Sequence, residues 1–248
     1  MDSYAKARSG FARGYDLRAA LCRSGSIIAL VQLFALAAHA QVLQPAAFIS
    51  LRSSVVRVEA EGERGRLFIG SGVTVAPGVV VTNCHVTRNA TTVRIAGSGS
   101  LWEVNGQYAD GNHDLCFLRA PTWRGNPVAL SERDSPQLGE AVAAIGFTGG
   151  TRMSLRFGNV SGLHFLDGGR VIESDAAFTS GASGGGLFDA SGALVGLLTF
   201  RSRGELGSYY SVPVRWIRER LPRDDQWAEV LPLHADTPFW QRYTETLP

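Results

Sequence analysis

The sequence predicts an all-β protein, built either as two packed β-barrels or as a β-sandwich. About twelve short segments rich in Val, Ile, Leu, Phe or Thr are bounded by Gly, Asn, Asp or Pro, which is typical of strands joined by turns. Glycine makes up 29 of 248 residues without a Gly-X-Y period, which excludes collagen and indicates many tight turns. No long segment with a 3.6-residue period interrupts the strands, so alternating strand–helix units are not expected.

The predicted strands fall into two sets of six, separated by a Pro-containing linker at 121–137. The first set is Ser53–Glu59, Arg66–Val75, Gly78–Thr82, Thr91–Ala96, Leu101–Tyr108 and Asp114–Arg119. The second set is Ala141–Phe147, Ser154–Phe165, Arg170–Glu173, Gly185–Phe188, Ala193–Phe200 and Ser208–Val212. Turn pairs typical of hairpins stand at Asn105-Gly106, Asp110-Gly111 and Asp167-Gly168.

One short helix is predicted after the last strand. It covers 213–221, because Val214, Ile217 and Leu221 would lie on one face. The polar segment 223–248 carries several aromatic residues but no pattern that predicts a structure.

The N-terminal segment 1–40 has the pattern of a signal peptide. Five basic residues precede the apolar run Ile27–Ala38, and Ala38-His39-Ala40 is a small-x-small cleavage site. The run is shorter than the ~20 residues that span a membrane. We therefore expect cleavage after Ala40 and export to the periplasm or the medium of a bacterium, with retention as an anchor as the alternative.

Cleavage after Ala40 would also change the charge. Removing five basic and two acidic residues from totals of 24 and 22 leaves 19 basic and 20 acidic residues. A nearly neutral chain gives no reason to expect a nucleic-acid partner, and no membrane contact is expected after cleavage.

Three stretches carry residues suited to peptide-bond hydrolysis: His85 in VVTNCHV, Asp114 in NHDLCFLRA and Ser183 in SGASGGGLFD. Singly, each is explained by a strand end, a turn cap or a surface turn. Together they supply a nucleophile, a base to activate it and a carboxylate to orient the base. Gly181 and Gly184 allow the turn around the serine, and the N–H groups of Gly181 and Ser183 can meet an oxyanion.

These stretches resemble the trypsin-like serine proteases, and most closely the HtrA/Deg-type bacterial enzymes. TNCH resembles the TAAH motif of the family, HDLCFL resembles its D-[IL]-A-[LV]-[LI] strand, and SDAAFTSGASGGGLFDASGALVGL is similar to its nucleophile segment. SYYSVPVRWI resembles the strand–helix junction that closes the domain.

The resemblance covers about residues 50–221 and implies a chymotrypsin-like fold of two six-stranded antiparallel β-barrels, with a protease domain at 41–222. It implies His85 as general base, Asp114 as orienting carboxylate, Ser183 as nucleophile, and Gly181 with Ser183 as oxyanion hole.

The chain departs from the family's pattern in three respects. Ala182 stands where classical trypsins carry an Asp that pairs with a newly cut N-terminus, so activation of that kind is not expected. Gly186 replaces the usual Pro. The segment after Leu221 is too short for a PDZ domain, so regulation by one is not expected.

The resemblance also implies a substrate pocket. Ala177 stands where trypsins carry the Asp that reads Lys or Arg, so cleavage after small or medium apolar residues is expected. Phe178 and Phe200 would line the pocket, and Arg201 would stand at its mouth. Thr199 would lie near Asp114 and donate a hydrogen bond to it.

The two cysteines that follow the signal segment lie beside the implied catalytic pair. Cys84 precedes His85, and Cys116 follows Asp114 by two residues. Pairing of the implied catalytic residues would bring the two strands together and predicts a Cys84–Cys116 disulfide, with two buried thiols as the alternative. A zinc site formed by Cys84, His85, His113 and Cys116 is disfavoured, because the adjacent ligands Cys84 and His85 give poor tetrahedral geometry. No cofactor or metal is expected.

Other readings remain. Residues 181–185 also fit the G-x-S-x-G elbow of α/β-hydrolases, but the strand–helix alternation is missing and His234 is the only later histidine. The glycine-rich turn lacks the Lys of a phosphate-binding loop. A non-enzymatic alternative is a protease-like fold kept as a peptide-binding or chaperone-like module. The expected partners are polypeptide substrates, unfolded or damaged proteins above all, and the oligomeric state stays open.

Overall fold

A computed structural model describes residues 49–97, 99–202, 207–233 and 237–242. They all belong to one of the chain's two structural units, Gln41–Pro248. The predicted signal segment 1–40 lies outside the described residues.

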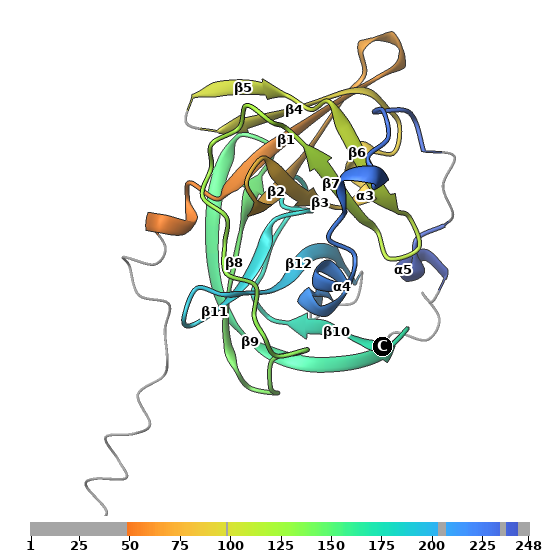
Figure 1. The fold of residues 1–248 in the computed structure, drawn as a ribbon. Helices are drawn as coiled ribbons and strands as arrows, with labels where there is room; N and C mark the ends of the chain where they lie inside the picture. The colour runs from red at the N-terminus through yellow and green to blue at the C-terminus, as the bar shows by residue number, and fades with distance from the viewer. Residues whose placement is uncertain (1–48, 98, 203–206, 234–236, 243–248) are drawn as a thin grey trace, which may run out of the picture. The chain divides into compact units, whose positions relative to one another are not determined.

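The first half of the fold is a seven-stranded antiparallel sheet (Figure 1). Its strands are β1 (Val55–Gly62), β2 (Leu67–Ala76), β3 (Val79–Thr82), β4 (Ala90–Gly97), β5 (Ser100–Glu103), β6 (Gly106–Asp110) and β7 (Leu115–Arg119). Their order across the sheet is β5-β4-β1-β2-β3-β7-β6.

The second half is a closed six-stranded barrel, as the sequence predicts. Its strands are β8 (Ala141–Thr148), β9 (Arg152–Leu166), β10 (Gly169–Ser174), β11 (Gly186–Asp189), β12 (Leu194–Arg201) and β13 (Tyr209–Pro213). They close in the order β10-β13-β12-β11-β8-β9. The all-β, chymotrypsin-like fold class is therefore confirmed.

Within the described part of the chain, helical structure is limited to short pieces, the first of which is a turn at 49–51. The others form named elements. They are α3 (Cys84–Thr87), α4 (Val214–Glu219), α5 (Phe239–Arg242) and the 3₁₀ turns η2 (Glu63–Gly65) and η3 (Asp224–Gln226). The helix predicted at 213–221 is α4, and its residues Val214 and Ile217 are buried as expected. The helix ends at Glu219, so the expectation for Leu221 is wrong: it lies beyond the helix and is exposed. No described helix has the length and apolar character needed to cross a membrane.

The first half differs from the prediction in its strand count. The segment predicted as one strand, Leu101–Tyr108, forms β5 and β6, which pair with β4 and β7 at opposite edges of the sheet. The chain changes partner at Val104 and Asn105, whose N–H groups donate to Val93 O at 3.0 Å and Arg119 O at 2.9 Å. The prediction of a closed, six-stranded first barrel is therefore wrong. The structure has a seven-stranded sheet, and Val104 and Asn105 connect its two edge strands, β5 and β6.

The apolar core consists of separate clusters, and successive side chains of one strand point into different clusters. In β1, Val56 and Val58 pack inside the first sheet, whereas Val55 belongs to a cluster that takes side chains from both halves of the fold. This two-residue period is what a strand between two apolar layers requires. A third cluster fills the second barrel.

The segment after α4 returns to the first sheet, although the sequence predicts no structure there. Gln107 of β6 forms an antiparallel bridge with Ala228. Further on, the N–H of Phe239 donates to Asn112 O at 3.1 Å, and the Phe239 side chain is fully buried. Figure 1 shows α5 next to the turn that joins β6 and β7.

Candidate active site

His85 and Asp114 form a hydrogen-bonded pair. His85 lies on α3, the helical turn after β3, and Asp114 lies directly before β7. The imidazole Nδ1 is 2.6 Å from Asp114 Oδ2, and the backbone N–H of His85 donates to Oδ1 at 2.8 Å. The Asp114 side chain is 1% exposed and that of His85 is 23% exposed. A buried carboxylate thus fixes one ring nitrogen and leaves the other edge of the ring accessible.

The backbone of Asp114 is fixed as well. Its carbonyl oxygen accepts the Cys84 N–H at 3.2 Å and Asn83 Nδ2 at 3.0 Å. Its φ of +56° lies in the left-handed region, which Asp tolerates better than most residues. Asn83 and Cys84, which precede His85 in the sequence, therefore fix the backbone of Asp114, whose carboxylate binds His85.

The predicted pairing of Cys84 with Cys116 is present in the structure as a disulfide. It joins α3 to β7, so it crosslinks the elements that carry His85 and Asp114. Because both sulfurs are bonded to each other, they are not available as thiolate ligands, and the alternative zinc site is excluded. The described residues contain no group of three or more His, Cys, Asp or Glu side chains arranged to hold a metal.

The loop around Ser183 is held through its carbonyl oxygens. Ser71 of β2 is buried and supplies two donors: its hydroxyl binds Gly181 O at 2.7 Å and its N–H binds Ser183 O at 2.8 Å. The N–H of Gly149 binds Ser180 O at 2.9 Å. The N–H of Gly185 binds Ala182 O at 2.8 Å. The four carbonyl groups from Ser180 to Ser183 are therefore all occupied.

The same loop leaves two N–H groups free. The Ala182 N–H donates to Thr179 O, and the Gly184 N–H donates to Leu198 O. Within the described part of the chain, neither Gly181 N nor Ser183 N has a hydrogen-bond acceptor. These two unpaired donors, separated by one residue and beside a serine hydroxyl, are the kind of groups that an oxyanion hole requires.

Two glycines are required for this loop geometry. Gly181 has φ +93°, and a Cβ there would stand 2.6 Å from Phe147 O. Gly184 has φ +85°, and its Cβ would collide with the backbone of Ser71. A side chain at either position would strain the backbone and push the loop away from β2 or β8.

Ser183 lies close to the segment that carries His85. A Cβ at Gly70 would stand 2.6 Å from Val86 Cγ1 and 3.2 Å from Ser183 O. The Ser183 hydroxyl donates to Thr199 O at 3.3 Å, and no hydrogen bond joins it to His85 among the described residues. The structure therefore shows the serine turned toward β12.

Thr199 lies near Asp114 as predicted, since Asn83 Nδ2 donates to both Asp114 O and Thr199 Oγ1, but it does not make the predicted hydrogen bond. Its hydroxyl donates to Leu197 O at 2.7 Å and accepts Asn83 Nδ2 at 3.3 Å, so it is engaged with β12 and Asn83 instead of the Asp114 carboxylate. The expectation of a Thr199–Asp114 hydrogen bond is wrong. The donor that Asp114 Oδ2 does receive, besides His85, is Trp240 Nε1 at 2.9 Å.

The other predicted pocket residues differ in exposure. Ala177 and Arg201 are exposed and Phe200 is half-buried. Phe178 is 6% exposed and packs against Tyr209 in the core of the second barrel, so it has little surface to offer a substrate. Phe200 stacks on Trp240 with ring centroids 5.5 Å apart.

Ser71 and Trp240 are site residues that the sequence does not reveal. Ser71 is one small polar residue inside a strand pattern, and its two contacts depend on how the sheet and the barrel pack. Trp240 stands in a segment without periodicity, more than 120 positions from Asp114. The aromatic residues of the tail are the only signal that could have drawn attention to it.

Comparison with known proteins agrees with this geometry. The trypsin-like peptidase domain family matches residues 70–197. The periplasmic serine endoprotease DegP of Salmonella typhimurium is 27% identical over 174 residues, which cover 65% of this chain and 37% of that enzyme.

Two solved structures are similar in fold. The HtrA-type protease AlgW with a tripeptide has a TM-score of 0.65 at 25% identity, covering 71% of this chain and 61% of AlgW. The Rv3671c protease of M. tuberculosis in its active form has a TM-score of 0.68 at 19% identity, covering 79% of this chain and 92% of that one. At that identity the likeness shows the fold alone.

The curated relatives are longer proteins, and the chain spans 37% of DegP and 34% of the chloroplastic Protease Do-like 1 of Arabidopsis thaliana. The family match covers more than half of the chain, from β2 to β12. The chain therefore belongs to the trypsin-like peptidase domain family, with HtrA-type proteases among its relatives.

Proposed function

We propose that this protein is a serine endopeptidase in which Ser183 is the nucleophile, His85 the general base and Asp114 the carboxylate that orients it. The observation that carries the proposal is the pairing of His85 Nδ1 with the buried Asp114 carboxylate at 2.6 Å. An imidazole held in this way presents Nε2, without a proton, to a neighbouring hydroxyl.

In the proposed reaction the Ser183 hydroxyl turns from Thr199 O to His85 Nε2. Its oxygen attacks the carbonyl carbon of the scissile peptide bond, and its proton passes to Nε2. The N–H groups of Gly181 and Ser183 stabilise the resulting oxyanion. Collapse of the tetrahedral intermediate breaks the C–N bond, and His85 gives its proton to the leaving amine. Water then hydrolyses the acyl-enzyme by the same steps, with His85 again as base.

The proposed substrate preference follows from the residues around Ser183. Ala177 puts no charge where a basic side chain would be read, and Phe200, which stacks against Tyr210 and Trp240, adds none. We expect cleavage after small or medium apolar residues, which unfolded proteins expose. Cleavage of a denatured protein mainly after Lys or Arg would contradict this preference.

Export belongs to the proposal too, with a protease domain at 41–222 that follows a signal segment removed after Ala40. The relative DegP is described as periplasmic, and a disulfide between Cys84 and Cys116 suits an oxidising compartment. N-terminal sequencing of the protein recovered from the periplasm tests it, with Gln41 as the expected first residue.

The direct test of the activity is labelling of the full chain with a fluorophosphonate probe. We expect one label on Ser183, and its loss in Ser183→Ala. Ser180→Ala is the matched control, because the exposed Ser180 side chain lies in the same loop while only its carbonyl oxygen is engaged. The unlabelled wild-type protein should also hydrolyse denatured casein, and labelling should abolish this activity.

One observation favours the alternative of a catalytically silent peptide-binding or chaperone-like module: the Ser183 hydroxyl is directed at Thr199 O. Folded protein that binds denatured casein, but that neither reacts with the probe nor cleaves the casein, would favour this module over the protease.

A further inference from the structure

We propose that Trp240, supplied by the tail helix α5, is a positioning residue that holds the Asp114 carboxylate for His85. The proposal rests on the assignment of His85 and Asp114 given above. It also gives the segment after the second barrel a role in the active site.

The hydrogen bonds of the carboxylate carry the first step. Oδ1 accepts the His85 N–H, and Oδ2 accepts His85 Nδ1 at 2.6 Å and Trp240 Nε1 at 2.9 Å. Among the described residues, Trp240 is thus the one donor to this buried carboxylate besides His85. An indole N–H can donate but not accept, so it binds the carboxylate oxygen as a donor and holds it in place.

The second step is the surroundings of the indole. Its ring meets the His85 ring edge to face, with centroids 5.7 Å apart and planes at 84°, and it stacks on Phe200 at 5.5 Å. The indole therefore restricts movement of the imidazole as well as of the carboxylate. The 23% exposure of the His85 side chain shows that Trp240 does not cover the imidazole.

The third step is the anchoring of α5. Phe239 is fully buried and packs against Trp216 of α4 and against Phe200, with ring centroids 5.6 and 6.0 Å apart. Its N–H donates to Asn112 O, two residues before Asp114. The tail is thereby held against β12, α4 and the turn before Asp114. The next side chain, Trp240, is directed at the Asp114 carboxylate.

The fourth step concerns Thr199, which was expected to donate a hydrogen bond to Asp114 but has other partners. The Thr199 hydroxyl donates to Leu197 O and accepts from Asn83. An unused acceptor site on a buried carboxylate is costly, and the indole N–H occupies it.

The experiment compares Trp240→Phe with Trp227→Phe in the full chain. Phe keeps an aromatic ring against His85 and Phe200 but lacks the N–H. We expect kcat on a peptide substrate to fall about tenfold in Trp240→Phe with KM unchanged, because orientation of the base is lost and not substrate contact. Trp227 is also a tail tryptophan, but its ring faces Arg119 at 5.7 Å, so Trp227→Phe should retain the wild-type kcat.

A spectroscopic measurement makes the result independent of hydrolysis. The chain has five tryptophans, so the ¹H–¹⁵N spectrum holds few indole signals, and the one missing in Trp240→Phe belongs to Trp240. This signal should lie downfield and move upfield in Asp114→Asn, because the charged acceptor is removed.

The two proposals fail in distinguishable ways. An active protein whose kcat is unchanged in Trp240→Phe would overturn the role of Trp240 and leave the protease assignment standing. Folded wild-type protein without hydrolase activity would overturn the protease assignment, while an indole signal that responds to Asp114→Asn would still support the contact. An indole signal that does not respond would overturn the role of Trp240 in either case.

Discussion

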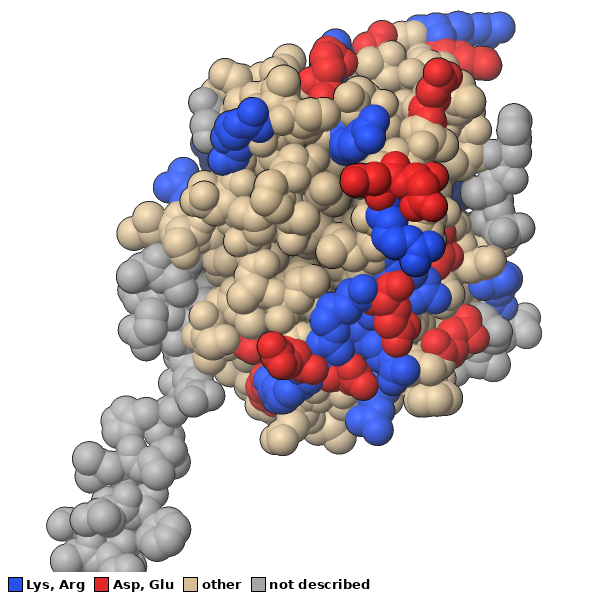
Figure 2. Space-filling model, in the orientation of Figure 1, with Lys and Arg blue, Asp and Glu red and all other residues tan. Residues whose placement is uncertain are grey.

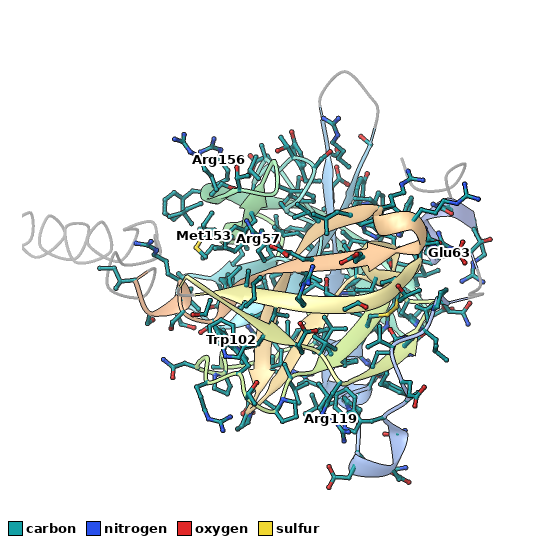
Figure 3. The ribbon with its side chains drawn as sticks, turned by 90° about the horizontal axis from the view of Figure 1, so that it is seen from above. Arg57, Glu63, Trp102, Arg119, Met153 and Arg156 are labelled. Carbon is teal, nitrogen blue, oxygen red and sulfur yellow. A yellow bond between two sulfur atoms is a disulfide. The ribbon has the colours of Figure 1, made fainter. Side chains whose placement is uncertain are left out.

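The backbone N–H of Gly149 binds the carbonyl oxygen of Ser180 at 2.9 Å. In a trans peptide the C=O and N–H groups point in opposite directions, so fixing Ser180 O also fixes the direction of Gly181 N–H, one of the two free donors beside Ser183. Gly149 lies in the turn between β8 and β9, and Arg57 of β1 donates to Gly150 O in the same turn at 3.4 Å. Figure 3 shows Arg57 beside Met153 of β9, the strand that follows this turn. A turn outside the nucleophile loop thus directs a donor within it.

Gly149→Ala should impair catalysis more than stability. Gly149 has φ +61° with open space around the missing Cβ, so Ala brings backbone strain of about 1–2 kcal/mol and no collision. The turn relaxes by moving the N–H away from Ser180 O, and Gly181 N–H loses its direction. We expect kcat to fall about tenfold, a fraction of what removal of an oxyanion donor costs.

Gly139→Ala is the matched control for Gly149→Ala. Gly139 has φ +77°, open space, and an N–H bonded to Val160 O, but it lies before the opposite end of β8. Both variants should lose similar stability in chemical denaturation, and only Gly149→Ala should lose kcat. Equal kcat in the two variants would show that the turn does not direct the donor.

Ser71→Ala should weaken the junction between the first sheet and the second barrel. The Ser71 hydroxyl accepts the Phe147 N–H at 2.8 Å and donates to Gly181 O, so Ala leaves two polar backbone groups without a partner. Each such group costs about 1–3 kcal/mol when buried, so for the two groups we expect the free energy of unfolding to fall by about 2–6 kcal/mol, together with kcat. The measurements are urea unfolding and steady-state hydrolysis.

A buried serine without such contacts provides the comparison for Ser71. Ser211 of β13 is 1% exposed, and its Oγ has no hydrogen-bond partner within the described part of the chain. Ser211→Ala should therefore leave stability nearly unchanged. If Ser71→Ala is equally harmless, the hydroxyl does not secure the loop.

The extent to which the sequence predicts the structure depends on the distance over which each feature acts. Alternation within β1 and the turn pairs are local, so most strands were predicted within a few residues. The His85–Asp114 pair and the Cys84–Cys116 bond were predicted because their neighbours form recognisable motifs. The split of Leu101–Tyr108 was missed because a change of pairing partner leaves the apolar pattern intact.

The incorrect expectation for Thr199 has a different cause. A threonine hydroxyl can donate to its own strand, and only the three-dimensional arrangement shows that it does. The indole that reaches Asp114 instead comes from Trp240, in a segment whose sequence has no period. Packing between distant segments decides both contacts, and the sequence pattern carries no record of it.

The face of the molecule seen in Figure 2 carries charges of both signs. On the face shown in Figure 2, basic and acidic side chains lie interspersed. Several form ion pairs, such as Arg133 with Glu140 and Arg218 with Asp134. Exposed pairs of this kind contribute little to stability.

Replacing both cysteines of the disulfide by Ala should destabilise the fold. The bond closes a loop with a sequence separation of 32, for which the chain-entropy relation gives roughly 3 to 4 kcal/mol. We expect the midpoint of urea unfolding of Cys84→Ala/Cys116→Ala to fall accordingly. Wild-type protein should shift to a similar midpoint in the presence of a reductant, and the double variant should not respond to the reductant. A midpoint equal to that of the oxidised wild type would contradict a stabilising role.

Asp110 joins the two halves of the fold through ionic contacts. Its carboxylate bonds His113 Nδ1 at 2.8 Å and pairs with Arg220, which follows α4. His113 also faces Asp167, and Arg220 also faces Glu219. Burial alone would raise the pKa of Asp110, but the hydrogen bonds and charges of His113 and Arg220 outweigh it and lower the pKa.

A carboxyl group whose pKa is lower in the folded state contributes stability above its unfolded pKa and loses it as the pH falls through the folded value. Asp110→Asn should therefore lower the free energy of unfolding near pH 7 by about 1.5–3 kcal/mol, the range for a hydrogen bond to a charged group. The difference from wild type should begin to shrink below about pH 4, where the carboxyl of the unfolded state first binds a proton, and should disappear only below the lowered pKa of the folded state. Asp225→Asn is the control, because Asp225 is 78% exposed and lies 3.8 Å from Arg223. Urea unfolding at a series of pH values measures both variants, and a deficit in Asp110→Asn that stays constant down to pH 2 would show that its effect is steric and not ionic.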